Sequence, residues 1–249
     1  MNNQPIEIIF ENDDVLVVNK PVGLLVHADG VSTELTLVDW LLERVPSVHG
    51  VGEPGKGKNG QWLERSGVVH RLDRETSGVL ILAKTAEAFI HLKAQFQERF
   101  AKKEYRAIVY GLIRERWGTI DKKIGRSPSD HRQRSAMPGA RGTLREAVTE
   151  WECIGQAQID GEHFSYLKLR PKTGRTHQLR VHLRAIDRPI VGDPLYAMPL
   201  LQTSHNLGLT RMALHAYMLE LTLPSGDRER FMAPIPRDLE AAAERIAEA

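Results

Sequence analysis

The sequence predicts an α+β fold in which short strands outnumber helices. Few stretches favour a helix, and in two of them, 36–45 and 86–100, apolar residues recur every three or four positions. Most other apolar runs are short and end at turn residues, as strands do. Because the strands alternate irregularly with these few helices, the pattern differs from a strict strand–helix–strand repeat. A chain of 249 residues can bury a full core, as one large domain or two small ones.

Composition and charge narrow the classes of protein to which the chain can belong. Net charge is +2, from 34 basic and 32 acidic residues, so the total does not indicate a nucleic-acid binder. The charge is distributed unevenly, however, because basic residues outnumber acidic ones between Lys102 and Arg145. The single cysteine, Cys153, cannot form a disulfide within the chain, which suits a cytoplasmic protein. The first residues lack a secretory signal, and no apolar run approaches the roughly 18 residues of a membrane span, so we expect no membrane partner.

The first hundred residues predict two strands, two helices and a loop. Strands are expected at Ile6–Phe10 and Val15–Asn19, on either side of a turn. A helix follows at 36–45, with Thr36 as its N-cap. The glycine- and lysine-rich stretch 46–66 has no periodicity and is expected to be a mobile surface loop. The helix at 86–100 should bury four apolar residues in the core: Phe89, Leu92, Phe96 and Phe100.

The second half predicts mainly strands. They are expected at 102–109, 118–124, 145–154, 164–170, 211–223 and 230–233. The alanine- and glutamate-rich end, 238–249, predicts a closing helix. Between these elements, the basic stretch 125–143 is either a solvated loop or a segment that grips RNA.

The residue types best suited to catalysis are concentrated in residues 70–78, which directly precede an apolar strand. Their sequence is His-Arg-Leu-Asp-Arg-Glu-Thr-Ser-Gly. Asp73 lies between Arg71 and Arg74, and these opposite charges keep a carboxylate ionised. An ionised aspartate at the rim of a core is a candidate nucleophile or electrostatic stabiliser. The structural alternative is a surface ion-pair cluster, since such networks perturb carboxylates too.

Three motifs resemble those of the RluA-type pseudouridine synthases. Residues 70–78 match the catalytic motif His-Arg-Leu-Asp-x-x-Thr-Ser-Gly at every fixed position. Residues 20–27 resemble its opening motif, Lys-Pro-x-Gly-Leu-x-Val-His, and residues 173–180 match Thr-Gly-Arg-x-His-Gln-Leu-Arg. The resemblance covers roughly residues 6 to 240.

The resemblance implies a role for individual residues. Asp73 matches the essential aspartate, Arg175 the arginine that pairs with it, and Tyr105 a tyrosine that lies against the target base. Arg71 matches a side chain that fills the gap left when the uridine is flipped out of the base stack. Six residues are expected to bind substrate: His70, Arg71, Arg74, Thr76, Gln178 and Arg180.

The same resemblance implies the architecture and partners. It predicts a mixed, mainly antiparallel sheet with flanking helices and a central RNA cleft, in a single catalytic domain over residues 1–249 without a separate RNA-binding domain. The implied reaction isomerises uridine to pseudouridine in structured ribosomal or transfer RNA. It needs no cofactor and no metal, and the five-residue separation of His177 and His182 does not fit a helical metal site. We expect a cytoplasmic monomer.

Two rival functions are weighed against this one. A catalytically inactive RNA-binding module of the same fold would have lost Asp73, Tyr105 or Arg175, and all three are present. A hydrolase that uses Asp73 with His70 or His177 would need a defined water activator, which the sequence does not provide. Ala197 and Leu223-Pro224 depart from the family pattern outside the catalytic motifs, so they bear on the substrate subtype.

Overall fold

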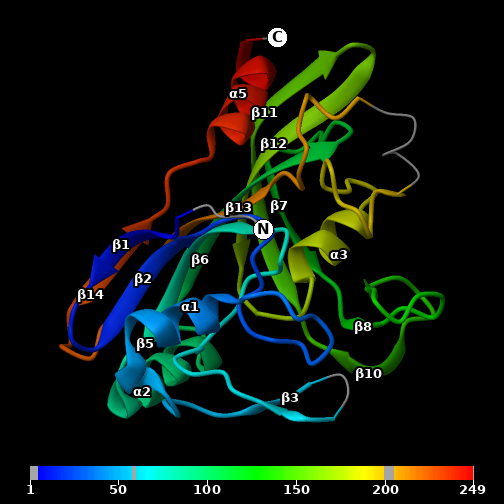
Figure 1. The fold of residues 1–249 in the computed structure, drawn as a ribbon. Helices are drawn as coiled ribbons and strands as arrows, with labels where there is room; N and C mark the ends of the chain where they lie inside the picture. Colours follow the sequence, from blue (N-terminus) through cyan, green and yellow to red (C-terminus); the bar gives the residue numbers. More distant parts are fainter. Residues whose placement is uncertain (1–4, 58–59, 199–204, 249) are drawn as a thin grey trace. The chain divides into compact units, whose positions relative to one another are not determined.

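A computed structural model describes residues 5–57, 60–198 and 205–248 (Figure 1). The chain divides into two compact units. The first comprises residues 1–103 and 216–234, and the second comprises 104–215 and 235–249.

The first unit is built on antiparallel strands with two helices. Its elements are β1 (Glu7–Glu11), β2 (Val15–Lys20), α1 (Leu37–Arg44), the 3₁₀ turn η1 (Pro46–Val48), β3 (Gly55–Lys56), β4 (Trp62–Leu63), β5 (Ser77–Ala83), α2 (Ala86–Gln97), β13 (Leu214–Thr222) and β14 (Arg228–Met232). Strand β2 pairs antiparallel with both β1 and β5, and β13 pairs antiparallel with β14. Every residue of β5 is buried, so this strand forms the centre of the unit's core.

In its described residues, the second unit is a curved antiparallel sheet with the helices α3 and α5. Its elements are β6 (Lys102–Tyr110), β7 (Trp117–Asp121), β8 (Ile124–Arg126), β9 (Arg134–Ser135), β10 (Arg141–Arg145), β11 (Val148–Ile159), β12 (Glu162–Pro171), α3 (Gln178–Arg184) and α5 (Arg237–Glu248). The strand order is β6-β12-β11-β7, and α5 lies alongside the long β11–β12 hairpin (Figure 1). Phe164, Leu167 and Leu169 of β12 are fully buried in the core of this unit.

The fold class predicted from the sequence is confirmed, and so are most of the predicted elements. Thr36 caps α1 as expected, because its hydroxyl accepts from the Asp39 amide while the Asp39 carboxylate accepts from the Thr36 amide. The strand after residues 70–78 begins earlier, at Ser77. Gly78 has φ +119°, and a Cβ there would lie 2.2 Å from the Ala216 carbonyl oxygen, so only glycine lets β13 approach β5 this closely.

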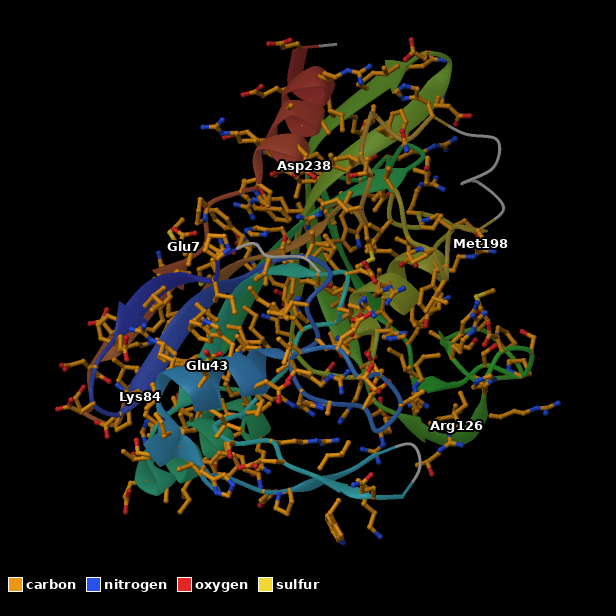
Figure 2. The ribbon with its side chains drawn as sticks, viewed as in Figure 1. Glu7, Glu43, Lys84, Arg126, Met198 and Asp238 are labelled. Carbon is orange, nitrogen blue, oxygen red and sulfur yellow. The ribbon has the colours of Figure 1, made fainter. Side chains whose placement is uncertain are left out.

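Two local predictions are wrong. The helix at 86–100 ends at Gln97, and Phe100 beyond it is 57% exposed rather than in the core. The described part of the stretch 46–66 is not an unstructured loop, because it contains η1 and the short β3–β4 hairpin. The basic stretch 125–143, expected as a loop or as an RNA-gripping segment, contributes to a small sheet in the order β10-β8-β9, with the exposed Arg126 on β8 (Figure 2). Its contact with RNA stays a prediction.

Candidate active site

Asp73 lies in a tight turn that leads into β5. The Thr76 amide donates to the Asp73 carbonyl oxygen at 3.1 Å and closes the turn. Leu72 before the turn is 4% exposed and Thr76 at its end is 2% exposed, so both ends are anchored in the core. Asp73 itself is partly buried. A short turn with buried ends holds its central carboxylate in a fixed place.

Lys20 ties the opening motif to this turn. Its side chain is fully buried, and Nζ donates to the carbonyl oxygens of Pro21 and Leu24, each at 2.8 Å, and of Arg74 at 3.3 Å. The Gly23 amide donates to the same Arg74 carbonyl at 2.9 Å. Because a buried ammonium must be hydrogen-bonded, Lys20 fixes both segments at once. The motif at 20–27 includes Lys20, but the resemblance assigned it no role.

His70 is engaged inside the first unit. Its Nε2 accepts from the Ile81 amide at 3.1 Å, and its ring stacks on Phe96 with ring centres 4.3 Å apart. Burial, with the nearby Lys103 charge, lowers the pKa of His70 to about 3. A neutral imidazole whose acceptor nitrogen is occupied supports β5. The substrate contact expected of His70 stays a prediction.

Arg71 is exposed and is held by a buried histidine of the opening motif. Its Nη1 donates to Nε2 of His27 at 3.1 Å, and Nδ1 of His27 donates to the Ala28 carbonyl at 2.8 Å. His27 is 6% exposed, and burial, with the Arg71 charge, lowers its pKa to about 4. The neutral ring therefore accepts from the guanidinium. His27 thus has a structural role in the site that its place at the end of the opening motif did not indicate.

Arg74 differs from Arg71 because it has carboxylate partners. Its Nη2 lies 2.8 Å from Oε2 of Glu34 and its Nε lies 3.9 Å from Oε1 of Glu75. Part of its charge is therefore neutralised within the protein.

Tyr105 and Arg175 belong to the second unit. Tyr105 is on β6, opposite Leu169 of β12, and packs partly buried against the core of this unit. Arg175 lies just before α3, where its amide donates to Oε1 of Gln178 at 3.0 Å and its Nε donates to the Glu146 carbonyl at 3.1 Å. Asp73 lies in the first unit, so its meeting with these two residues stays a prediction.

Gln178 and Arg180 are buried, and both make contacts inside the protein. Gln178 accepts from the Thr173 hydroxyl at 2.7 Å and donates to the Val148 carbonyl at 3.0 Å, which fixes the turn that carries Arg175. The Arg180 guanidinium makes two 2.8 Å hydrogen bonds to the carboxylate of Asp193, which is fully buried. These contacts favour positioning roles, and the substrate contacts predicted for both residues are untested.

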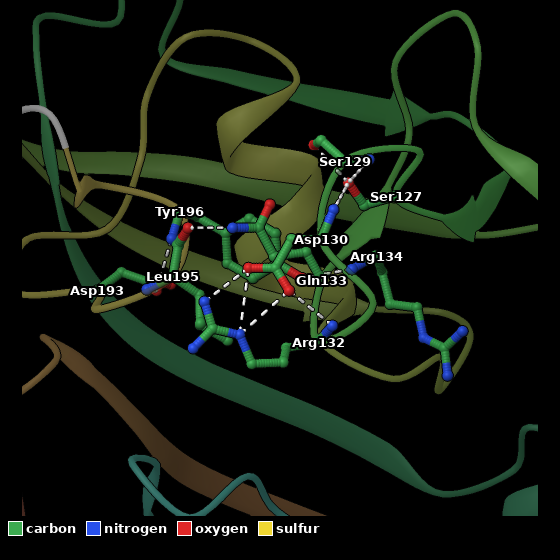
Figure 3. A network of polar contacts seen from close by, with 9 residues as sticks. All are labelled: Ser127, Ser129, Asp130, Arg132, Gln133, Arg134, Asp193, Leu195 and Tyr196. Atoms are coloured by element: carbon green, nitrogen blue, oxygen red, sulfur yellow. Dashed lines mark hydrogen bonds and ion pairs between the residues drawn. The ribbon is translucent and has the colours of Figure 1, made fainter.

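A polar network joins the segment after Arg180 to the small β10-β8-β9 sheet (Figure 3). Asp193 Oδ1 accepts from the amides of Leu195 and Tyr196 at 2.8 and 3.0 Å. The Tyr196 hydroxyl accepts from the Arg134 amide at 2.8 Å and lies 2.9 Å from Nδ1 of His177. The network therefore connects the turn of Arg175 to a basic hairpin, and a hollow of about 300 Å³ lies between that hairpin and α3.

The helix after the third motif, α3, begins at Gln178. His177 precedes it in the left-handed region, with φ 56°. His182 is buried, with Nδ1 2.9 Å from the Thr149 hydroxyl and Nε2 3.0 Å from the Lys122 carbonyl. Within the described ranges, no three His, Cys, Asp or Glu side chains are grouped to hold a metal ion, and no helix is long and apolar enough to cross a membrane.

Comparisons with known proteins agree with this arrangement. Residues 14–185 match the family model described as RNA pseudouridylate synthase. The chain is 38% identical over 239 residues to an uncharacterized RNA pseudouridine synthase of Synechocystis, covering 96% of this chain and 68% of that protein. It is 38% identical over 242 residues to the ribosomal large subunit pseudouridine synthase D of Neisseria meningitidis, covering 94% of this chain and 59% of the relative.

Solved structures give the same result. Human RNA pseudouridylate synthase domain containing 1 superposes with a TM-score of 0.73 at 29% identity, covering 96% of this chain and 87% of that one. Human RNA pseudouridylate synthase domain containing 4 superposes with a TM-score of 0.69 at 26% identity, covering 96% of this chain and 92% of that one. The family predicted from the three motifs is thus confirmed, and the chain belongs to the RNA pseudouridylate synthase family as an RluA-type member.

Proposed function

We propose that this chain isomerises uridine to pseudouridine within RNA, with Asp73 as the catalytic carboxylate. The observation that carries the proposal is the family match over residues 14–185, which includes the whole Asp73 turn. Because the chain spans only 59% to 68% of the length of the two curated relatives described above, activity and substrate are proposed here rather than transferred from them.

The chemistry requires one carboxylate and no cofactor. The N1–C1′ bond of uridine breaks, the uracil turns, and C5 bonds to C1′; C5 then loses a proton and N1 gains one. Glycosidases use two carboxyl groups because a leaving oxygen must be protonated. Here the leaving uracil is retained and rebonds, so a single carboxylate suffices. Asp73 either attacks C1′ or removes the 2′ proton to give a glycal, and both routes end with the carboxylate regenerated.

The proposal assigns further roles in both units. Arg175 would orient the Asp73 carboxylate through its planar fork, and Tyr105 would stack on the uracil and assist removal of the C5 proton. Arg71 would fill the gap in the base stack after the uridine has flipped out. On this proposal, residues 1–249 work as one catalytic domain.

The contacts of the histidines argue against a hydrolase. Hydrolysis at Asp73 would require a base that activates water. Nε2 of His70 already accepts from the Ile81 amide, and Nδ1 of His177 is within hydrogen-bond distance of the Tyr196 hydroxyl. Because these ring nitrogens already have partners within the protein, neither histidine provides the base that would activate water.

We propose ribosomal RNA as the substrate class. Relatives of this chain are named ribosomal large subunit pseudouridine synthases, and transfer RNA is the alternative target. The basic β10-β8-β9 sheet would contact the RNA backbone, with the protein acting as a cytoplasmic monomer without a metal or cofactor.

The test is Asp73→Asn, which keeps the side-chain size and removes the charge. Release of tritium from C5-labelled uridine in RNA should fall by several powers of ten, while RNA affinity stays close to that of the unmodified chain. Asp13→Asn is the matched control, because Asp13 is exposed in the β1–β2 turn. Activity of Asp73→Asn within about tenfold of the unmodified chain, a difference of about 1.4 kcal/mol, would contradict the assignment.

A further inference from the structure

Arg65 is a partly buried cation that the sequence motifs do not include. It follows β4, and its guanidinium lies directly on the backbone of β3: a Cβ at Gly55 would be 2.0 Å from Cζ and 2.1 Å from Nε of Arg65. The Nε atom is buried and has no hydrogen-bond partner within the described part of the chain. A buried donor without a partner is costly, so such a group calls for an explanation.

The charge of a second guanidinium, that of Arg71, acts on Arg65. Burial lowers the pKa of Arg65, and the nearby Arg71 charge lowers it further. Both charges also lower the pKa of His27, whose neutral ring accepts from Arg71 at 3.1 Å. Two cations and a neutral imidazole are therefore grouped in the first unit, where like charges repel unless an anion joins them.

The carboxylates near this group have other partners. Glu64 accepts from the Ser66 hydroxyl at 2.6 Å and from the Gly50 amide at 3.1 Å, with His49 at 3.4 Å. Oδ1 of Asp29, which also acts on His27, accepts from the amides of Val31 and Ser32.

Arg74 provides the contrast, because it pairs with Glu34 at 2.8 Å. Across the described residues, no ion pair joins a carboxylate to Arg65 or Arg71. The two guanidiniums thus retain their charge for an external partner.

We propose that Arg65 and Arg71 form a binding site for a backbone phosphate of the RNA substrate. A phosphate oxygen would accept from the Arg65 guanidinium once that side chain turns its Nε toward the RNA. The exposed Arg71 guanidinium, which enters the gap in the base stack, would contact the same phosphate from the solvent side. Guanidiniums suit this ligand because their planar donors match phosphate oxygens in pairs. The neutral His27 fixes Arg71 without adding a third charge.

The position of the site determines which phosphate it binds. Arg71 is two residues before Asp73, so the bound phosphate belongs to the target nucleotide or its immediate neighbour. Holding that phosphate fixes the backbone about which the uridine turns when it leaves the stack. This inference rests on the proposed function, and it adds a contact that sets the position of the flipped nucleotide.

The experiment measures RNA affinity by fluorescence anisotropy across a salt series. The probe is a labelled RNA stem-loop with uridines in its loop. Each phosphate contact to a single strand contributes about 0.7 to the slope of log affinity against log salt. Arg65→Gln should lower the slope by about that amount, so its loss of affinity should be about 2.6 times larger at the lower end of a fourfold salt range than at the upper end. An unchanged slope overturns the proposal.

A second variant tests placement rather than charge. Gly55→Ala keeps Arg65 but introduces a Cβ where its guanidinium lies, so it should also weaken binding. Arg99→Gln is the matched control, because it removes one exposed arginine from the same unit and should leave the slope unaltered. If Arg65→Gln and Arg99→Gln reduce the slope equally, the reduction comes from the loss of any positive charge, and the proposed site is wrong. Unchanged thermal unfolding confirms that each variant folds.

Two further arms separate the possible explanations. Inorganic phosphate should displace RNA from the unmodified chain at lower concentration than from Arg65→Gln. Phosphate that binds without displacing RNA would mean a site for a free anion, which overturns the proposal. Tritium release is measured in parallel. If the unmodified chain releases tritium but Arg65→Gln leaves the salt slope unchanged, only this inference is refuted. If Arg65→Gln lowers the slope but the unmodified chain releases no tritium, only the proposed function is refuted.

Discussion

His27 should make the protein less stable on acidification, at pH values well above those at which its carboxylates are protonated. This imidazole is 6% exposed, and burial together with the Arg71 charge holds its pKa at about 4, against 6.5 for a free histidine. The unfolded chain therefore binds a proton that the folded chain does not between about pH 6.5 and 4. Stability contributed by the neutral ring is complete above pH 6.5 and is lost as the pH falls toward 4. At pH 5 the loss from His27 alone is about 2 kcal/mol.

Urea unfolding at pH 7.5 and pH 5 measures this loss. Carboxylates contribute little to the change between these two pH values. Glu220 is an example, because its cationic neighbours, Arg230 first, lower its pKa to about 2. The stability that it contributes is therefore lost only below the ordinary carboxyl pKa of 4.5. His27→Gln removes the titrating group, so its stability should fall about 2 kcal/mol less between the two pH values than that of the unmodified chain. The remaining fall comes from groups such as His70, whose pKa is also lowered by burial.

His49→Gln is the matched control, since its side chain is 77% exposed in the same unit. It should lose as much stability on acidification as the unmodified chain. If His27→Gln loses as much as His49→Gln does, His27 is not held neutral by its surroundings, and the account of how Arg71 is fixed is wrong.

Three further substitutions test other parts of the site. Arg175→Lys keeps the charge but loses the planar fork, so tritium release should fall by several powers of ten; equal rates would refute the orienting role. Tyr105→Phe should bind RNA normally but complete turnover slowly in single-turnover assays, and an unaltered rate would confine Tyr105 to stacking. Asp193→Asn leaves the Arg180 guanidinium buried without its carboxylate, so it should cost about 3 to 5 kcal/mol in urea unfolding. A loss below about 1 kcal/mol would show that the pair is exposed to water in solution.

Local sequence rules predicted the elements that local interactions determine. The N-cap of α1 depends on two residues three positions apart, Thr36 and Asp39, and both sides of that capping box form. The apolar run after residue 78 is a buried strand because nothing polar interrupts it. Phe100 was misplaced because helical periodicity was extended past Gln97, where the chain leaves the helix and the next residues no longer share its face.

Several contacts at the site join residues far apart in the sequence, so the sequence did not predict them. Lys20 and Arg74 are 54 residues apart, and His27 and Arg71 are 44 apart, so no local pattern links them. Arg180 shows the same limit in another way. Its place in a basic motif suggested RNA, and only the fold reveals that Asp193 neutralises it inside the protein.

The net charge of +2 gives no measure of the field that RNA would meet, because many of the described cations pair with carboxylates within the protein. Glu220 alone accepts ion pairs from Lys102, Arg228 and Arg230, and Glu104 pairs with two arginines. A cation committed to a carboxylate contributes little to phosphate binding, since it must first give up that partner. On the proposed function, we therefore expect arginines without a carboxylate partner to hold the RNA backbone. Within the described part of the first unit, Arg65 and Arg71 are such a pair, and they lie next to the turn that carries Asp73.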